Sequence, residues 1–347
     1  LEKGDGHCMD LRSTFQKATI VRFLLDAGNR PVSGSVLCEA LSCTRQAVWK
    51  SVKSLLEEGF VISGKPHEGY RLVSLPEYDL APSLIGAWLQ IRSAWKGSVL
   101  LYDAVSSTQL AAKEQARKGV THGTTVIAES QFRGRGRLNR SWVAHPNEGI
   151  AMSVILYPKL KPYRLQLVNL AAGMAVGKAI REKTGIPCSL KWPNDILVSG
   201  RKVTGILSEA SLDQDRILFV VTGIGININT PLSSFPGELS GHVTSLREET
   251  GRTLHRGDLV VEVLSELFRY ISKLEKEPSD FLDDYRAQCS SLGQRVLVDT
   301  GEEKVEGTAL DIHETGALIV SSSSGIRLFT AADVVHATFP GLHSELL

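Results

Sequence analysis

The 347-residue sequence has no long hydrophobic run and no strong excess of charge of either sign. Its longest apolar stretches, such as "RILFVVTGIGI", have the length of a strand and fall short of the roughly 18 residues of a membrane-spanning helix. The N-terminal stretch "LEKGDGHCMD" contains no apolar signal core. We therefore expect a cytoplasmic protein that does not enter a membrane.

The net charge is close to zero, because 39 lysines and arginines stand against 38 aspartates and glutamates. No field of the whole molecule draws the protein to nucleic acid, so any such binding depends on a local basic patch. Hydrophobic residues make up 42% of the chain, which is enough for a sizeable core, and the length suggests two or three domains.

Cysteine is scarce, and its spacing does not indicate a metal site. The five cysteines are odd in number and have no paired metal-ligand spacing, which favours reduced, packed thiols and no metal bound by the protein itself. They are Cys8, Cys38, Cys43, Cys188 and Cys289.

Changes in residue pattern divide the chain into three domains and one linker, with an α+β fold overall. Residues 10–74 are predicted to be helical and then briefly β, and a linker with two prolines follows over 75–84. Residues 85–288 form a long mixed α/β stretch. Residues 289–340 alternate short apolar runs with turns, which is typical of a small all-β barrel.

The first domain is predicted to be a winged helix-turn-helix. A short helix, a tight turn at 42–44 and a longer helix precede "FVIS" and "YRLV", which make a two-stranded wing. The core face of the longer helix carries apolar residues at i, i+4, i+7 and i+8, namely Val48, Val52, Leu55 and Leu56. The residues expected to reach base edges and phosphates are Thr44, Arg45, Gln46, Trp49, Lys50 and Lys53.

Two interpretations of this domain stay open. In the first, the domain is a plain three-helix module for protein interaction, and its basic face is simply exposed to solvent. The turn and the wing together favour a DNA-binding head that resembles those of bacterial repressors. Such a head is expected to bind DNA as a dimer, because one small head makes few contacts.

The central stretch contains an arginine-glycine loop, "SQFRGRGRLNRSW" at 130–142, directly after a buried strand. Glycine allows close backbone approach and arginine offers a fork of donors, so the loop indicates a phosphorylated ligand. A dinucleotide fingerprint is excluded because Asn139 stands at the third glycine position and no helix follows, and no P-loop motif occurs. Non-specific binding of nucleic acid is the alternative.

Three further motifs accompany this loop. "YDAVSSTQ" (102–109) ends a strand with three hydroxyls, although such a run is often only a helix N-cap. "KWPNDILVSGRKVTGILSEA" (191–210) is predicted to be two strands joined by a turn at 199–201. In "VVTGIGININT", Gly223 and Gly225 allow a close approach to the strand.

Together, "ESQFRGRGR", "KWPNDILV", "GILSE" and "GIGININ" behind "SSTQ" resemble the biotin protein ligases. The winged head makes the chain similar to the bifunctional type that is also a biotin-operon repressor, and the tail resembles that family's SH3-like C-terminal domain. The resemblance covers nearly the whole chain. It implies a central catalytic domain of the biotin/lipoate ligase type.

The resemblance implies two reactions. Biotin attacks the α-phosphate of ATP, with Mg²⁺, to give biotinyl-5′-AMP, and a lysine of a biotin carboxyl carrier protein then attacks this mixed anhydride. Positioning and charge stabilisation suffice for such chemistry, and the motifs contain no Ser/His/Asp or Cys/His arrangement. Implied partners are the carrier protein, operator DNA and, when adenylate is bound, a second copy of the chain.

The resemblance also implies roles for residues at the motif positions. The catalytic residues would be Lys191, Arg135 and Arg137. Biotin would be bound by Ser107, Thr108, Gln131, Gly134, Arg135, Gly136, Lys191, Gly205 and Gly225. ATP and the adenylate would be bound by Arg137, Arg140, Trp142, Asn194 and Asn227. Asp195 is expected to position Lys191 or the loop.

Several alternatives to these roles stay open. Lys191 could be a surface lysine, and Trp142 could be a core residue. The family loop often has a glycine where Asn139 stands, after a variable residue at Leu138, which bears on loop closure. The whole protein could also be a biotin-responsive repressor without ligase activity, or a ligase whose head has no operator.

Overall fold

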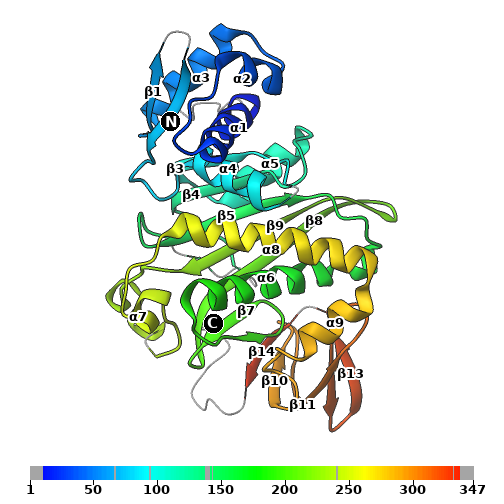
Figure 1. Cartoon of the computed structure of the whole chain (residues 1–347). Helices are drawn as coiled ribbons and strands as arrows, with labels where there is room; N and C mark the ends of the chain where they lie inside the picture. The colour runs from blue at the N-terminus through cyan, green and yellow to red at the C-terminus, as the bar shows by residue number, and fades with distance from the viewer. Residues whose placement is uncertain are drawn as a thin grey trace, which may run out of the picture.

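The structure is a computed structural model that describes residues 11–65, 68–93, 95–136, 141–142, 144–239, 241–330 and 332–336. Three units follow one another from top to bottom in Figure 1: a small head, a large sheet covered by helices, and a small all-β unit. The α+β fold predicted from the sequence is confirmed. No helix among the described residues is long and apolar enough to cross a membrane.

The head is a winged helix-turn-helix, as predicted. Its elements are α1 (Leu11–Ala27), α2 (Gly34–Leu41), α3 (Arg45–Glu57), β1 (Val61–Lys65) and β2 (Gly69–Ser74). The turn forms because Ser42 adopts a left-handed conformation (φ 47°) and the Thr44 hydroxyl accepts a hydrogen bond from the Ala47 amide at 3.3 Å. The predicted core stripe was one residue too long, since Leu56 at its edge is 46% exposed.

The segment predicted as a linker is not a loose connection. Helix α4 (Pro82–Arg92) begins inside it, and Leu80 and Ala81 just before the helix are buried. The prediction was wrong here because the two prolines were interpreted as breakers. Pro82 instead occupies the start of a helix, where its missing N–H costs nothing.

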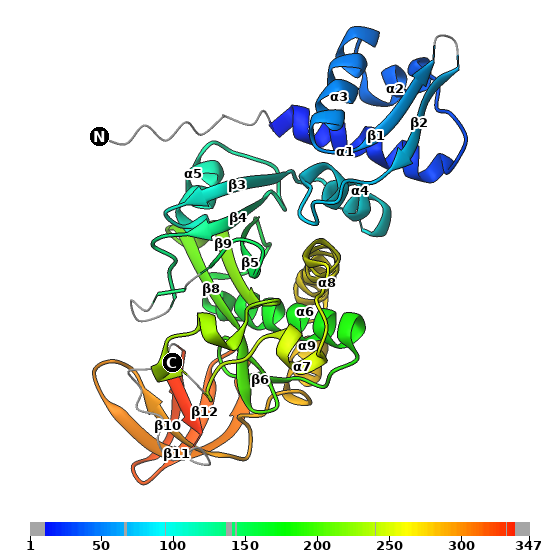
Figure 2. The same ribbon diagram turned by 90° about the vertical axis from the view of Figure 1, so that its left-hand side faces the viewer.

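Helix α4 belongs to two hydrophobic cores at once. Leu84 and Ala87 pack in the core of the head, whereas Ile85 and Leu89 pack in the core of the central unit. Figure 2 shows α4 between the head and the helices of the central unit. The head is therefore attached through a shared, buried helix.

The central unit is built on a seven-stranded sheet with the order β3-β4-β5-β9-β8-β7-β6. Only the β3–β4 pair is parallel. The strands are β3 (Val99–Val105), β4 (Thr125–Gln131), β5 (Gly149–Leu156), β6 (Ser189–Lys191), β7 (Asp195–Val198), β8 (Arg201–Asp213) and β9 (Arg216–Asn227). The predicted turn between β7 and β8 is present, with Ser199 and Gly200 both at positive φ.

Helices cover both faces of this sheet. The helical elements among the described residues of this unit are α5 (Thr108–Arg117), α6 (Gln166–Thr184), α7 (Leu246–Thr250), α8 (Arg256–Lys276), α9 (Pro278–Arg286) and the short 3-10 turns Pro162–Arg164, Leu232–Ser234 and Gly237–Leu239. The main core lies between the sheet and the α6–α8 layer, and a smaller core lies under α5. Figure 1 shows α8 and α6 crossing in front of the strands.

The C-terminal unit is a five-stranded antiparallel sheet with the order β13-β12-β11-β10-β14. Its strands are β10 (Arg295–Asp299), β11 (Lys304–Ile312), β12 (Leu318–Ser322), β13 (Gly325–Phe329) and β14 (Asp333–His336). It is fixed to the "KWPND" segment, because the Trp192 indole N–H donates to the Gly316 carbonyl at 3.0 Å. This contact brings the all-β unit next to the site described below.

Candidate ligand pocket and DNA-binding helix

A pocket of about 550 Å³ opens among the motifs of the central unit. Its wall combines the start of α5, the end of β4, the arginine-glycine loop, the start of β5, the "KWPND" segment and the facing parts of β8 and β9. The wall is completed by a segment after β9 and by Val334 of the C-terminal unit; the lining residues of that segment are Ser234, Phe235, Pro236, Glu238 and Leu239. Segments far apart in the sequence thus meet around one cavity.

The structure brings together most of the predicted site residues. Those that line the pocket are Ser107, Thr108, Gln131, Arg135, Gly136, Trp142, Lys191, Asn194, Gly205, Gly225 and Asn227. Gly134 is not among the lining residues. Arg137, Leu138, Asn139 and Arg140 lie outside the described residues, so their predicted roles stay predictions.

The hydroxyl run at the start of α5 faces the pocket. The Thr108 amide and hydroxyl both donate to Gln131 Oε1, at 2.7 and 3.1 Å, which fixes the Gln131 side chain. Ser107 stands at the N-cap position, yet its side chain makes no cap hydrogen bond, and its buried Oγ has no hydrogen-bond partner. Because Ser107 lines the pocket, its hydroxyl is free of protein partners at a place that a ligand can reach.

The glycines of β8 and β9 are needed for close contacts, but with the protein's own side chains. A Cβ atom at Gly225 would lie 2.2 Å from the Trp142 ring, and one at Gly205 would lie 3.0 Å from it. At Gly223 a Cβ would meet Gln109 Oε1 at 2.7 Å. The indole of Trp142 therefore lies flat against a floor of two glycines that face each other in the β8–β9 register.

At the base of the arginine-glycine loop, the two ends of the loop pair as short antiparallel backbone segments. Arg135 pairs with Ser141, and the Trp142 amide donates to the Gly134 carbonyl at 3.1 Å. A Cβ at Gly134 would lie 2.0 Å from the Trp142 carbonyl oxygen, so only glycine fits this crossing. Gly134 thus holds Trp142 in place and does not line the pocket. The Arg135 guanidinium lies 4.0 Å from Glu209.

Two lysines and one carboxylate of the pocket wall come from the neighbouring strands β6, β7 and β8. Lys191 pairs with Asp195 in the β6–β7 register, and Lys202 on β8 forms an ion pair with Asp195 at 2.8 Å. The sequence analysis missed Lys202, because "SGRKV" has the composition of an ordinary hairpin turn. It also missed Glu148, whose Oε1 accepts from the Ser234 hydroxyl at 3.0 Å while its buried Oε2 has no hydrogen-bond partner.

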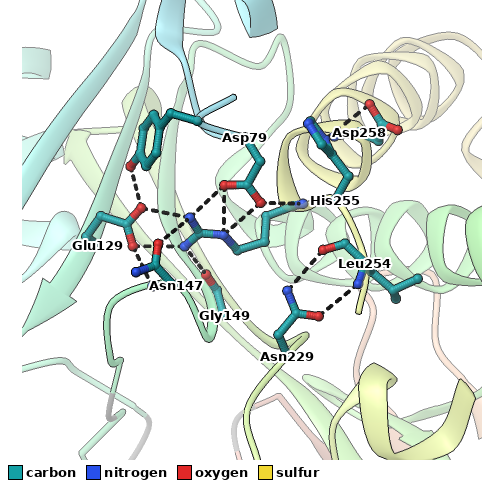
Figure 3. A network of polar contacts seen from close by, with 10 residues as sticks. Asp79, Glu129, Asn147, Gly149, Asn229, Leu254, His255 and Asp258 are labelled. Atoms are coloured by element: carbon teal, nitrogen blue, oxygen red, sulfur yellow. Dashed lines mark hydrogen bonds and ion pairs between the residues drawn. The ribbon is translucent and has the colours of Figure 1, made fainter. Parts of the chain in front are cut away.

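A second polar cluster, the Arg256 network, lies beside the pocket (Figure 3). The nearly fully buried Arg256 side chain binds Asp79 at 2.7 Å and Glu129 at 2.8 Å. It also contacts Asn147 Oδ1 and the Gly149 carbonyl oxygen, each at 3.4 Å. The network joins the segment before α4 to the ends of β4 and β5. No sequence motif identified it.

Burial and pairing have opposite effects on the charges of this network. Burial alone would raise the pKa values of Asp79 and Glu129, but hydrogen bonds and the charge of Arg256 outweigh it and hold both pKa values below their usual range. Burial and a hydrogen bond to Glu129 raise the pKa of the Tyr78 phenol. Both carboxylates therefore stay ionised at neutral pH.

The residues predicted to face DNA lie on the exposed side of the head. Thr44, Arg45, Gln46, Trp49, Lys50 and Lys53 are all exposed. Trp49 is 55% exposed, and the Lys53 ammonium lies 6.0 Å from the centre of its ring. An exposed tryptophan with basic neighbours at the start of a recognition helix fits the predicted DNA contact, which remains a prediction.

Comparison with known proteins gives matches along most of the chain. The model of the biotin/lipoate A/B protein ligase family matches residues 101–227, a helix-turn-helix domain model matches residues 16–71, and the biotin protein ligase C terminal domain model matches residues 291–337. The chain is 34% identical to the bifunctional ligase/repressor BirA of Bacillus subtilis (strain 168), over 93% of this chain and 99% of that protein.

Two further relatives extend this comparison. The biotin–[acetyl-CoA-carboxylase] ligase of Mycobacterium tuberculosis is 32% identical and covers 76% of this chain and 96% of its own length. The structure of the biotin protein ligase from Aquifex aeolicus in complex with biotin and ATP has a TM-score of 0.61 and 31% identity, and covers 70% of this chain and all of that one. The chain belongs to the biotin/lipoate A/B protein ligase family.

Proposed function

We propose that the protein is a biotin protein ligase that forms biotinyl-5′-AMP from biotin and ATP and transfers biotin to a lysine of a biotin carboxyl carrier protein. We further propose that it represses biotin genes through its winged head. The observation that carries the ligase assignment is one pocket that collects Ser107, Gln131, Trp142 and Lys191 from three separate motifs. The name of the Bacillus subtilis relative supports both activities.

In the first step a carboxylate oxygen of biotin bonds to the α-phosphorus of ATP, and the bond from that phosphorus to pyrophosphate breaks. The protein supplies no nucleophile. Its task is to hold two anions together and to stabilise the charge that develops between them. We assign this task to Lys191, with Arg135 and Arg137 on the loop side.

The ureido ring of biotin fits the hydroxyl and amide groups at the start of α5. Because Thr108 occupies Gln131 Oε1, the amide group of Gln131 is the part that can donate to a ligand. Ser107 Oγ offers a hydroxyl that lacks a protein partner. Gly136 lines the same wall, and Gly134 supports it through the loop base.

The adenylate fits the wall formed by Trp142 and two asparagines. The side-chain amides of Asn194 and Asn227 donate to the carbonyls of Ile206 and Thr244, at 3.2 and 3.1 Å, which directs their oxygens as acceptors. We propose that the Trp142 ring, which packs on Gly205 and Gly225, covers the adenine. Arg137 and Arg140 are assigned to the phosphates.

Mg²⁺ enters with ATP in this proposal. The orphaned, buried Glu148 Oε2 is a hard oxygen that fits such a cation, whereas Asp195 is paired with Lys202. When bound, the ion would neutralise phosphate charge. The chain's own residues position the two substrates around it.

In the second step the amine of the acceptor lysine attacks the carbonyl carbon of the anhydride, and AMP leaves. For the repressor activity, we propose a cytoplasmic protein that binds operator DNA as a homodimer once the adenylate is bound. Thr44, Arg45, Gln46, Trp49, Lys50 and Lys53 would face the DNA.

The ligase assignment is tested by incubating the purified protein with MgATP, labelled biotin and an apo carrier domain. We expect label on one acceptor lysine and release of pyrophosphate; an unlabelled acceptor, with a known ligase active in parallel, would contradict the ligase assignment. Footprinting of the DNA upstream of biotin genes, with and without biotinyl-5′-AMP, tests the repressor separately. Protection that requires the adenylate is expected, and its absence would contradict the repressor activity alone.

A further inference from the structure

We propose that Lys202 is a second catalytic cation, which binds the β- and γ-phosphates of ATP and stabilises the departing pyrophosphate in the first step. This inference rests on the proposed ligase function. It assigns a role to a residue outside the arginine-glycine loop and outside the "KWPND" motif.

The backbone of Lys202 is held from both sides, so its side chain starts from a fixed point. On one side it pairs with Leu197 of β7. On the other side its N–H donates to the His242 carbonyl at 2.8 Å, and its carbonyl accepts from the Thr244 amide at 2.9 Å. The backbone is thus fixed at one end, and the ion pair with Asp195 restrains the ammonium at the other, so the side chain is partly ordered before a ligand binds.

The side chain of Lys202 runs along the floor of the pocket. Its Cε lies 3.6 Å from where a Cβ of Gly205 would be, and that same position is 3.0 Å from the Trp142 ring. The aliphatic stem thus lies beside the indole that we assign to the adenine. Lys202 lines the cavity on the side that we assign to the nucleotide.

The charges of the described wall residues nearly cancel, although both substrates are anionic. The described wall residues that carry a full charge are the cations Arg135, Lys191 and Lys202 and the anions Glu148, Asp195 and Glu238, so the wall as a whole is close to neutral. Triphosphate and biotin are both anionic, and Lys191 is already assigned to the carboxylate and the α-phosphate. Arg137, Arg140 and Mg²⁺ are assigned to the phosphates, and Lys202 would share with them the negative charge that develops on the leaving group.

Asp195 explains how a cation can be kept in the pocket before ATP binds. The Lys202 and Asp195 side chains are only 17% and 11% exposed, and their ion pair spans 2.8 Å. An unpaired ammonium at this depth would carry a desolvation cost. ATP can share or replace the carboxylate as partner of Lys202, since phosphate oxygens also carry negative charge and accept hydrogen bonds from an ammonium group.

In this step the carboxylate oxygen of biotin bonds to the α-phosphorus, and the electron pair of the breaking bond goes to the bridging oxygen of pyrophosphate. Lys202 donates hydrogen bonds to that product without giving up its proton. In the second step pyrophosphate has gone, so Lys202 is not needed. Loss confined to the first step therefore distinguishes this role from a general role in shaping the pocket.

The test compares two half-reactions of the full chain. Lys202→Met keeps the stem and removes the charge, Lys202→Arg keeps a cation, and Lys178→Met removes a lysine from a comparable ion pair with Glu266 on the helical layer. The readouts are biotin-dependent exchange of pyrophosphate into ATP and transfer from prepared biotinyl-5′-AMP to the carrier domain. Circular dichroism checks that each variant is folded.

We expect Lys202→Met to lower exchange by about 100-fold or more, a typical result of removing one electrostatic donor. Transfer from the adenylate should stay within about twofold, as should both readouts for Lys178→Met, and Lys202→Arg should recover much of the exchange. Equal losses in both half-reactions, or no loss in exchange, would overturn the proposal. Absence of exchange in the unmodified protein would instead contradict the ligase function.

The double variant Asp195→Asn with Lys202→Met separates the lost cation from the unpaired anion that it leaves behind. If the ammonium itself is needed, exchange stays low when the carboxylate is also removed. If exchange recovers, the loss in Lys202→Met came from the orphaned Asp195, and Lys202 is a structural partner only. The double variant leaves neither member of the Lys202–Asp195 pair charged, and Asp195→Asn alone shows whether loss of the carboxylate disturbs Lys191.

Discussion

The ligand pocket and the Arg256 network are two polar clusters at the same ends of β4 and β5, yet they differ in how their polar atoms are paired. Glu129 and Gln131 are two residues apart on β4, and Glu148 and Gly149 are adjacent. In the network, Arg256 contacts two carboxylates, an amide oxygen and a carbonyl (Figure 3). In the pocket, Ser107 Oγ and Glu148 Oε2 are buried without a hydrogen-bond partner.

This difference separates structure from ligand binding. Buried polar groups in folded proteins are almost always hydrogen-bonded. A cluster whose polar atoms all have partners within the protein therefore contributes to folding and needs no ligand. A cluster with partnerless polar atoms around an open cavity is suited to binding, because a ligand can supply the missing hydrogen-bond partners. Changes in the network should therefore reduce stability first, and changes in the pocket should reduce activity first.

The largest effect is expected for Arg256→Met, which leaves the Asp79 and Glu129 carboxylates buried without their cation. Breaking a buried ion pair in this way costs about 3 to 5 kcal/mol of unfolding free energy. Urea unfolding followed by circular dichroism measures it. Arg256→Lys keeps the charge and should cost less, because a lysine cannot reproduce the fork of bonds to Asp79. Equal stability of all three proteins would show that the network contributes nothing.

On the other side of the comparison, Lys191→Ala should affect activity far more than stability. Loss of one preorganised charge should raise the barrier to adenylate formation by about 2.7 to 4 kcal/mol. The unfolding free energy should change by less than about 1 kcal/mol, as is usual for partly exposed charges. Pyrophosphate exchange and urea unfolding of the same samples give both numbers. A large loss of stability with near-normal exchange would reverse the assignment.

The pH dependence of stability should come from the network. Asp79 and Glu129 have pKa values lowered in the folded state, so their stabilisation is fully present above the ordinary values of about 3.9 and 4.3 and is lost as pH falls through the lower, folded values. We expect the unfolding free energy to fall with decreasing pH below about 4. Asp79→Asn should be less stable at neutral pH and should show a shallower fall. Parallel curves for the two proteins would contradict this origin.

The same comparison explains what could be predicted from the sequence. The pocket residues lie in local motifs whose glycines, arginines and hydroxyls are unusual together, so Ser107, Gln131 and Lys191 were identified. Arg256 was not, because its partners lie more than 100 positions away and each is ordinary in its own stretch. Such pairings depend on the tertiary fold, not on local pattern.

Lys202 and α4 were missed for related reasons. A lysine two residues after a glycine in "SGRKV" is typical of a hairpin, and only the β7–β8 pairing, in which Lys202 lies opposite Leu197, brings its ammonium group to Asp195. Prolines in the segment before α4 suggested a linker, but the burial of Leu80 and Leu84 depends on the head and the central unit both being present. Contacts between distant parts of the chain decided both cases.

The smallest effect is expected for Ser107→Ala, which removes the hydroxyl that has no partner in the folded protein. Since no protein hydrogen bond is lost, the unfolding free energy should stay the same or rise slightly. Biotin binding should weaken by about 0.5 to 1.5 kcal/mol, the usual net value of one hydrogen bond. Ser83→Ala, at a buried hydroxyl of α4 that also lacks a hydrogen-bond partner and does not line the pocket, serves as the matched control and should leave biotin affinity unchanged. Calorimetric titration with biotin, together with urea unfolding, measures both quantities. If Ser107→Ala loses stability and keeps its affinity for biotin, the hydroxyl contributes to folding and not to binding. The distinction between polar atoms paired within the protein and polar atoms left for a ligand would then be wrong for Ser107.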